Sequence, residues 1–336
     1  MFRFPAILAA FAFILCGHAR ADDLPPARSG GADDQALLAI PEASDAKPLD
    51  PAIVAAFTGA AEAYGTRDFR AARAAWADLA RDGFAPAQYN LAVMLEHGRG
   101  GTVDYAAAAE WYARAADQDV AQAMINLARL HFEGRGVKRD PSEGLRRLRM
   151  AAMLDAPRAA YNLGVAYLKG MGTKADAAEA ANWFGRAADA GHGPAAYNLA
   201  VLYRDGRGVE RDRARARTLF AKAADNGDAF ARYAFADMLI ADAKGDVRGI
   251  KVALDHLRRA AEAGVTVAQN RLAIVLAKGE GTKRDPETAL MWFHVAAGMG
   301  ADNAAKNRDA LAATLDDATR AKAKRRADAF QPNARP

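Results

Sequence analysis

The feature that most constrains the fold of this chain is an internal repeat with a period of 36 residues. A large apolar residue, two glycines separated by one residue, an aspartate six residues after the first glycine and a pair of alanines recur with this period, apart from one interval of 37. Independent markers with one common period predict a stack of similar structural units rather than one globular core. The large apolar residues are Leu91, Leu127, Leu163, Leu199, Phe235 and Leu272, and the first glycines are Gly98, Gly134, Gly170, Gly206 and Gly279.

Each unit has the pattern of two antiparallel helices. In the first complete unit, apolar residues spaced for one face of a helix run through residues 85–97, and Gly98 follows where a left-handed C-cap suits glycine. Asp104 then stands where its carboxylate accepts hydrogen bonds from the first turn of a second helix. Small residues such as Ala115 and Ala116 let that helix approach its neighbour closely. One pair of helices cannot bury its apolar stripe alone, so the units must stack, and the chain is predicted to be an all-α solenoid.

Two of the second helices carry a stronger start signal. Asp140 is followed three residues later by Glu143, and Asp176 by Glu179. This is the spacing of a capping box, in which the glutamate bonds back to the amide of the aspartate. Pro141 directly follows Asp140, at the first helical position, where proline is favoured. These signals predict that the second helices begin at the aspartates.

The first 21 residues have the composition of a secretory signal. Arg3 precedes an apolar run over residues 4–17, which is short for a membrane-spanning helix, and a small-x-small cleavage site follows it. The prediction is an exported protein, periplasmic or secreted, that loses residues 1–21. A lipoprotein anchored at Cys16 is the alternative.

The remaining chain divides into four predicted parts. Residues 22–49, rich in proline, glycine and acidic residues, are expected to form a flexible linker. Residues 50–83 are expected to form an N-terminal capping helix pair, residues 84–301 about six repeats, and residues 302–336 the C-terminal capping helices and tail. The fifth repeat lacks the glycine pair and is degenerate. Terminal units are expected to differ from internal ones because they shield the ends of the stack.

Charge and cysteine content exclude several classes of function. The formal net charge is +5, and the one basic cluster, residues 320–326, is interpreted as a solvated helix face, so nucleic acid is not predicted as a partner. The single cysteine, Cys16, lies in the predicted signal, so the mature chain is expected to have no disulfide and no cysteine metal site. No later segment is apolar over enough residues for stable insertion into a membrane.

The sequence contains no recognisable catalytic grouping. The three serines, Ser29, Ser44 and Ser142, lie in no nucleophile motif. None of the histidines stands three or four residues from another, so no metal site is predicted. The glycine pairs follow helices rather than strands and recur with the repeat, which favours helix capping over a phosphate-binding loop. We therefore predict a protein without enzymatic activity, cofactor or metal.

The markers together resemble the Sel-one-like repeat, a subfamily of the tetratricopeptide repeats. Stretches such as Ala196–Leu199, Gly206–Val209 and Ala223–Ala224 carry the likeness, which extends over residues 84–301. The resemblance implies a right-handed α-solenoid of antiparallel helix pairs that works as an adaptor. Some bacterial members are periplasmic regulators of sensor kinases, and this chain resembles them in layout. A cysteine-rich branch is linked to β-lactam binding or hydrolysis, but it has a disulfide in each repeat, which this chain does not.

An asparagine, usually preceded by a tyrosine, recurs directly before the large apolar residue of the predicted first helices. In related solenoids the first helices line a concave groove, and the resemblance implies that an asparagine there bonds the backbone of an extended peptide. An amide has donors and an acceptor, so it can pair with a peptide of any sequence. The alternative is that the asparagines brace the neighbouring helix and that the tyrosines are partly core. The predicted groove residues are Asn90, Asn126, Asn162 and Asn198, here called the asparagine column, with Tyr89, Tyr161, Tyr197 and Tyr233.

The resulting hypothesis is an exported scaffold or adaptor for a protein or peptide partner, such as an envelope protein or the periplasmic domain of a sensor kinase. Two alternatives stay open: a β-lactam-acting enzyme, and a structural protein that binds the cell wall by stacking tryptophans on sugars. Trp111, Trp183 and Trp292 recur with the repeat, which favours core packing over contact with sugars.

Overall fold

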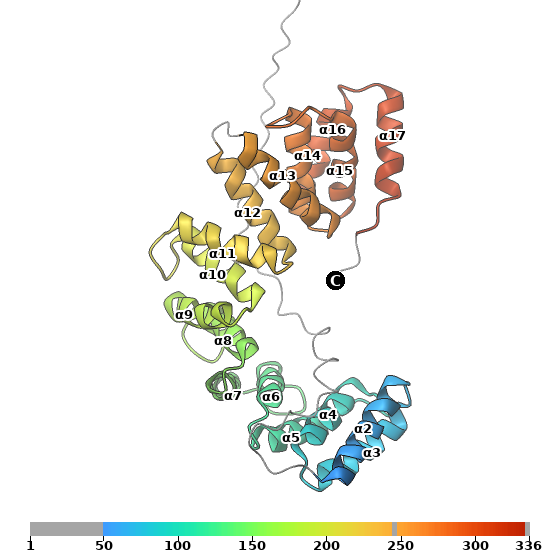
Figure 1. Cartoon of the computed structure of the whole chain (residues 1–336), viewed down its shortest axis with the longest axis vertical. Coiled ribbons are helices and arrows are strands. Elements are labelled where there is room, and N and C mark those ends of the chain that lie inside the picture. Colours follow the sequence, from blue (N-terminus) through green and yellow to red (C-terminus); the bar gives the residue numbers. More distant parts are fainter. Residues whose placement is uncertain (1–49, 244–246, 333–336) are drawn as a thin grey trace, which may run out of the picture. The chain divides into compact units, whose positions relative to one another are not determined.

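The structure is a computed structural model that describes residues 50–243 and 247–332. The predicted signal, residues 1–21, and the predicted linker, residues 22–49, lie outside the described residues. Sixteen helices and no strand occur in the described part of the chain, which confirms the all-α prediction (Figure 1). The chain divides between residues 213 and 214 into two compact units. They are named here the N-terminal unit and the C-terminal unit.

The N-terminal unit consists of antiparallel helix pairs. Each helix packs against the one before it in the chain, so the second helix of one pair contacts the first helix of the next. The first helices are α2 (Pro51–Gly65), α4 (Ala85–His97), α6 (Ala121–Glu133), α8 (Pro157–Lys169) and α10 (Gly193–Asp205), and the second helices are α3 (Phe69–Arg81), α5 (Tyr105–Ala116), α7 (Pro141–Met153) and α9 (Ala177–Asp189).

The C-terminal unit continues the same alternation and ends in a shorter helix pair. Its last helix packs on α15. Its helices are α11 (Arg213–Asp225), α12 (Ala229–Asp242), α13 (Val247–Glu262), α14 (Thr266–Lys278), α15 (Pro286–Gly298), α16 (Asp302–Ala312) and α17 (Asp317–Asp328).

One aspartate joins the two helices of a pair. The backbone N–H of Asp104 donates to the carbonyl of Leu95, in the last turn of α4, at 2.9 Å. Its carboxylate accepts from the amide of Ala107, in the first turn of α5, also at 2.9 Å. The aspartate therefore satisfies an orphan carbonyl of one helix and an orphan amide of the next. The same two bonds recur at Asp140, Asp176 and Asp285.

This double role makes the predicted capping box wrong at Asp140. A capping box needs a free backbone amide on the aspartate. That amide donates instead to the carbonyl of His131 at 3.0 Å, and Glu143 bonds two arginines of its own helix. The amide of Asp176 is likewise donated, to the carbonyl of Tyr167. The aspartate side chains do cap both helices as predicted.

The two glycines of each pair perform different tasks. The first ends the first helix in the left-handed conformation, as predicted; Gly170, for example, has a φ of +70°. The second, Gly172, has a φ of +72° and lies against the start of the preceding second helix, so that a Cβ there would overlap the carbonyl group of Pro141. This loop therefore touches the previous repeat backbone to backbone. Equivalent overlaps with backbone would occur at Gly100, Gly136 and Gly208, whereas a Cβ at Gly281 would meet the side chain of Ile250.

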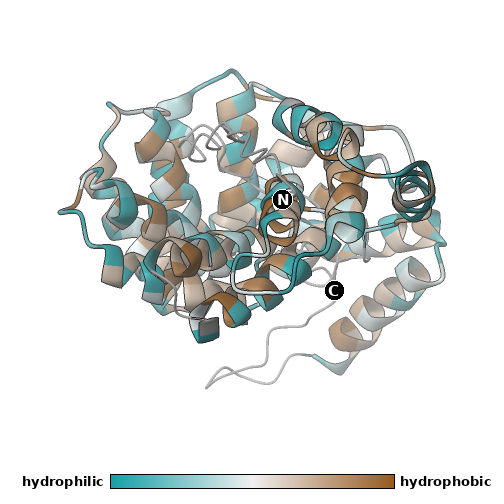
Figure 2. Ribbon diagram, turned by 90° about the horizontal axis from the view of Figure 1, so that it is seen from above, coloured by the Kyte–Doolittle hydropathy of each residue, from teal (hydrophilic) through white to brown (hydrophobic). Residues whose placement is uncertain are grey.

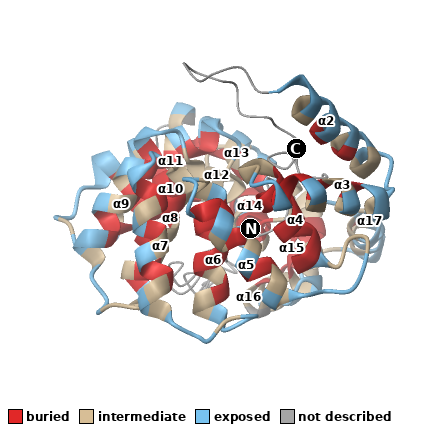
Figure 3. Cartoon of the chain, turned by 90° about the horizontal axis from the view of Figure 1, so that it is seen from below, coloured by how far each residue is buried: buried red, intermediate tan, exposed pale blue. Residues whose placement is uncertain are grey.

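Alanines fill most of the contact between helices, and a few large side chains fill the rest. Trp76, Tyr112 and Phe184 are fully buried in the N-terminal unit, as is Phe293 in the C-terminal unit. Hydrophobic and hydrophilic residues alternate along the helices in Figure 2, and the buried faces are marked in Figure 3. The paired alanines are buried as predicted except Ala297, which is partly exposed; exposure is at most 2% at Ala115, Ala116, Ala151, Ala152, Ala187, Ala188, Ala223, Ala224, Ala260, Ala261 and Ala296.

The contact made by Gly172 can be separated from its backbone conformation. Gly191, in the loop between α9 and α10, also has a positive φ, +87°, but a Cβ there would meet nothing within 4 Å. We expect Gly172→Ala to lower the free energy of unfolding by at least about 2 kcal/mol more than Gly191→Ala, because only the first change pushes two repeats apart. Urea unfolding of the two variants, followed by far-UV circular dichroism, measures the difference, and equal losses would contradict the assigned contact.

Candidate functional site

The asparagine column lies where the repeat places it, with one asparagine on each of α4, α6, α8 and α10. Asn90, Asn126 and Asn198 have only 2%, 6% and 2% of their surface exposed. Asn162 is partly exposed. Equivalent positions in the sequence thus differ in accessibility, and three of the four amides are almost completely covered in this structure.

Asn126 belongs to a buried polar network that joins three helices. Its side-chain nitrogen donates to the hydroxyl of Tyr112 at 3.2 Å, and that hydroxyl donates to the carboxylate of Glu96 at 2.9 Å. Arg129 forms an ion pair with the same carboxylate. Burial, and next the charge of Glu96, raise the pKa of Tyr112 well above its ordinary value, so the hydroxyl stays a donor. In this repeat the asparagine braces its neighbours, which was the alternative interpretation of the column.

Asn198 has the same position in the repeat but different surroundings. Among the described residues, neither its side-chain nitrogen nor its oxygen has a hydrogen-bond partner. The residue 72 positions after Tyr112 is Phe184, and Asn198 lies 72 positions after Asn126. The hydroxyl that satisfies one asparagine is therefore missing from the repeat of the other. A buried amide without partners costs about 1–3 kcal/mol, so this position calls for an explanation.

The predicted groove tyrosines are mainly buried in the two units. Tyr89, Tyr161 and Tyr197 have 4%, 6% and 5% of their surface exposed, and Tyr233 is partly exposed. The ring of Tyr161 stacks on His192, with 4.7 Å between the ring centroids. Burial, and next Arg158, lower the pKa of that histidine, so it is a neutral packing group near neutral pH. The exposed ring surface that a partner could contact is small.

An exposed apolar pair at the end of α7 was missed by the sequence analysis. Met153 has 78% and Leu154 has 42% of its surface exposed. The equivalent positions in the flanking repeats carry Asp117 and Gln118, and Asp189 and Ala190. The change from polar or small residues to large apolar ones at these two positions is the signal in the sequence that could have identified this surface.

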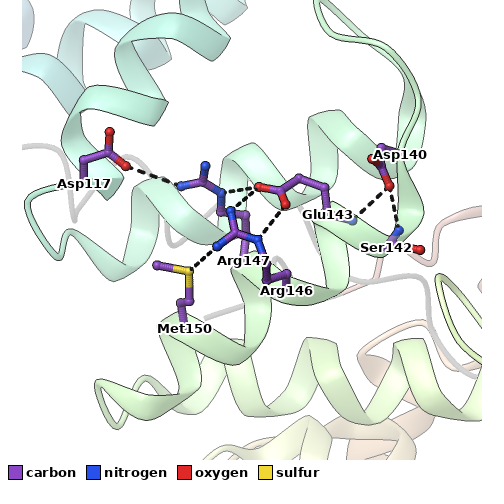
Figure 4. A network of polar contacts seen from close by, with 7 residues as sticks. All are labelled: Asp117, Asp140, Ser142, Glu143, Arg146, Arg147 and Met150. Atoms are coloured by element: carbon purple, nitrogen blue, oxygen red, sulfur yellow. Dashed lines mark hydrogen bonds and ion pairs between the residues drawn. The ribbon is translucent and has the colours of Figure 1, made fainter.

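A charged network links the ends of α5 and α7 (Figure 4). Glu143 accepts two hydrogen bonds from Arg146 and one from Arg147, each at 2.7 Å. Arg147 also lies 3.6 Å from the carboxylate of Asp117, at the end of the preceding second helix. The bonds from Arg146, followed by those from Arg147, lower the pKa of Glu143 to about 2. Figure 4 also shows Asp140 accepting from the backbone amides of Ser142 and Glu143.

A pocket of about 450 Å³ lies in the C-terminal unit, among α15, α16, α17 and the segment that follows. Its volume is in the range of small-molecule sites. The repeat pattern does not predict this pocket, because much of its lining comes from the degenerate last helix pair. The lining residues are His294, Val295, Ala297, Gly298, Met299, Arg308, Lys324, Ala327, Asp328, Phe330 and Pro332.

Within residues 50–243 and 247–332, no group of three or more histidine, cysteine, aspartate or glutamate side chains is arranged to hold a metal ion. Over the same residues, every helix is too short or too polar to cross a lipid bilayer.

The repeats match a known family model. Residues 85–120, 121–155, 157–192, 193–228, 243–265 and 266–300 each match the Sel1 repeat. The chain belongs to the Sel1 repeat family. The resemblance carried by the glycines, aspartates and paired alanines is thereby confirmed, and the molecule is a Sel1-like solenoid scaffold.

Solved structures of bacterial proteins resemble this Sel1 repeat chain. A Sel1 repeat protein from Oxalobacter formigenes is 28% identical, with a TM-score of 0.63 over 72% of this chain and 98% of its own. A protective antigen of uropathogenic Escherichia coli with an SLR fold is 20% identical, with a TM-score of 0.42 over 78% and 87%. An immunity protein from Pseudomonas aeruginosa is 21% identical, with a TM-score of 0.42 over 75% and 84%. No curated protein matches the chain.

The Glu143 network is expected to stabilise the Sel1 repeat scaffold in a pH-dependent manner. The pKa of Glu143 is depressed from 4.5 to about 2, so its contribution is fully present above pH 4.5 and is lost as the pH falls towards 2. At pH 7, Glu143→Gln should lower the free energy of unfolding by about 1 kcal/mol, a value reduced for the solvent near the pair.

Urea unfolding at pH 7, 4 and 2.5 measures this dependence, and the wild-type advantage should shrink over that series. Glu110→Gln, at an exposed position on α5, is the matched control and should change little. A wild-type advantage that is constant with pH would show that the network contributes through packing and not through charge.

Proposed function

We propose that this Sel1 repeat protein is an interaction scaffold that binds an extended segment of a protein partner across α8 and α10. The observation that carries the proposal is the buried amide of Asn198, which has no hydrogen-bond partner among the described residues. A peptide backbone supplies both a donor and an acceptor, which are the groups that an asparagine amide lacks here. Bonding to such a backbone would recover the free energy of the unpaired amide.

The proposed site uses two of the four asparagines predicted for the groove, Asn162 and Asn198. Asn126 already donates an amide hydrogen to Tyr112 within the buried network around Glu96. Asn162 is partly exposed and has the same position on the preceding first helix as Asn198. Since α8 and α10 both pack on α9, these two asparagines lie on consecutive first helices that share one neighbouring helix. Asn162 is the part of the site that a partner reaches first.

Binding at Asn198 requires a local rearrangement, because 2% exposure leaves no room for a peptide against the amide. The exposed pair Met153 and Leu154 offers apolar contact area in the same unit. Exposed apolar residues on a surface, here in place of polar or small ones, are typical of contact sites between proteins.

The partner that fits the predicted export of the chain is an envelope protein or the periplasmic domain of a sensor kinase. This part of the proposal rests on the signal predicted for residues 1–21 and on the resemblance in layout to periplasmic regulators.

Contact with cell-wall sugars is disfavoured by the surroundings of the tryptophans. The guanidinium of Arg114 lies over the ring of Trp111 at 4.6 Å, and that of Arg186 over the ring of Trp183 at 4.7 Å. Both rings also pack against the core of the N-terminal unit. A sugar would have to displace an arginine that already satisfies the ring face.

Replacing Asn198 by leucine separates binding from stability. We expect Asn198→Leu to raise the free energy of unfolding by about 1 kcal/mol, since it removes an unpaired buried amide, and to weaken peptide binding at least tenfold. A peptide is first selected from a displayed random library against the wild-type chain, and its Kd is then measured by fluorescence anisotropy. Asn182→Ala, an exposed asparagine on α9, is the control and should change neither quantity.

A second variant tests the reason for the open amide. Phe184→Tyr supplies the hydroxyl that Tyr112 provides to Asn126, so Asn198 gains an internal partner and the peptide should bind more weakly. Unchanged Kd values in both Asn198→Leu and Phe184→Tyr would exclude this site. A large loss of stability in Asn198→Leu would instead show that the amide braces the fold.

A further inference from the structure

The pocket in the C-terminal unit combines an apolar wall with groups of both charges. Val295, Met299, Phe330 and Pro332 line it with apolar surface, and α15 and the segment after α17 contribute them. Met299 has 53% of its surface exposed, which is high for a large apolar side chain. An exposed apolar wall inside a concave site favours a ligand with an apolar part of its own.

Two cationic side chains from different helices line the same pocket. Arg308 comes from α16 and Lys324 from α17. Each is held by an aspartate of its own helix: Arg308 lies 2.8 Å from Asp309, and Lys324 pairs with Asp328. These ion pairs fix the direction of the side chains but leave donors unused, because a guanidinium has five N–H groups and an ammonium three.

The neighbouring histidine responds to this positive charge. Burial, and next the charges of Arg308 and Lys324, lower the pKa of His294, which also lines the pocket, while Asp328 and Asp309 act in the opposite direction. The two cations have the larger effect on this histidine, so they disfavour a third positive charge at this wall and favour an anion there.

Acceptors also line the pocket. Asp328 lines it from α17, and Ala297, Gly298 and Met299 line it from the C-terminal end of α15. A helix C-terminus carries partial negative charge on its last carbonyls, so N–H groups are favoured beside it. The pocket thus offers cations, acceptors and apolar surface within one small-molecule volume.

We propose that this pocket binds a free carboxylate attached to an apolar residue, as found at the C-terminal end of a peptide. The carboxylate lies between Arg308 and Lys324, the apolar side chain lies against Phe330 and Met299, and the peptide N–H groups lie toward Asp328. A free N-acyl amino acid has the same chemistry and is the second source of such a ligand. The site involves neither Asn198 nor any other residue of the proposed peptide site on α8 and α10.

The test compares matched ligands on the full chain by isothermal titration calorimetry. The probes are acetyl-Ala-Ala-Leu with a free carboxylate, the same peptide with a C-terminal amide, and N-acetylleucine. We expect the free acid to bind saturably and the amide to bind at least tenfold more weakly, because only the acid offers a charge to Arg308 and Lys324. Equal binding of tripeptide and N-acetylleucine would assign the free acyl amino acid as the source; tighter binding of the tripeptide would assign a protein C-terminus.

Variants locate the binding. Arg308→Gln and Lys324→Gln should each weaken the free acid about tenfold and leave the amide unchanged. Arg325→Gln is the matched control, since this exposed cation of α17 does not line the pocket. Trp292 lies 5.0 Å from Phe330 between ring centroids, so its fluorescence reports on the pocket, and Trp292→Phe should abolish the signal without abolishing the heat of binding.

Three results would overturn the proposal. One is the lack of saturable binding by either carboxylate probe up to about 10 mM, the weak end of specific affinity. Another is equal affinity for acid and amide. The last is a loss in Arg325→Gln as large as in Arg308→Gln, which would show a general charge effect of α17. None of these results bears on Asn198, so the proposed scaffold function is tested separately.

Discussion

The contact on which most of the repeat scaffold depends is the approach of a glycine loop to the backbone of the preceding second helix. Where Gly172 lies against the carbonyl group of Pro141, no side chain fits, and both partners are backbone. The contact is therefore independent of the side chains around it, and it recurs at Gly100, Gly136 and Gly208. Asp176 fixes the geometry of the same loop by bonding both helices of its pair. Together, Gly172 and Asp176 set the position of one helix pair relative to the next. The distance between the helix pairs then determines how closely the alanines pack.

These local devices are the part of the fold that the sequence predicts well. The first glycine and the aspartate act on backbone groups a few residues away. Their contacts can therefore be predicted from the spacing of residues in the sequence. The capping box at Glu143 failed for the opposite reason. The backbone amide of Asp140 donates to the carbonyl of His131, nine positions back on another helix, and Arg146 and Arg147 donate to the carboxylate of Glu143. A local motif was overruled by a contact between helices, which the motif itself does not encode.

The sequence predicts which positions form the candidate site, but the repeat pattern does not predict whether each amide there is already hydrogen-bonded. All four asparagines lie at the same place in the repeat, but what each amide does depends on the side chain that the previous second helix presents. Tyr112 satisfies Asn126, whereas Phe184 has no hydroxyl for Asn198. A comparison of repeats along the sequence contains this difference, since both pairs are 14 residues apart. The sequence contains no such signal for the pocket, because side chains outside the repeat pattern, from α15, α16 and α17, form it.

Most of the residues that recur along the repeats have a task in folding. Gly172 and Asp176 join helices, the paired alanines space them, and Asn126 braces them. A residue with such a task is not available to a ligand unless the fold yields. Surface for a partner must therefore come from positions where one repeat departs from the others. Phe184 leaves the amide of Asn198 without a partner, Met153 and Leu154 replace polar or small residues, and the degenerate last pair forms a pocket with unused donors. The family match accounts for the shared positions, and the binding sites proposed for this member lie at these departures.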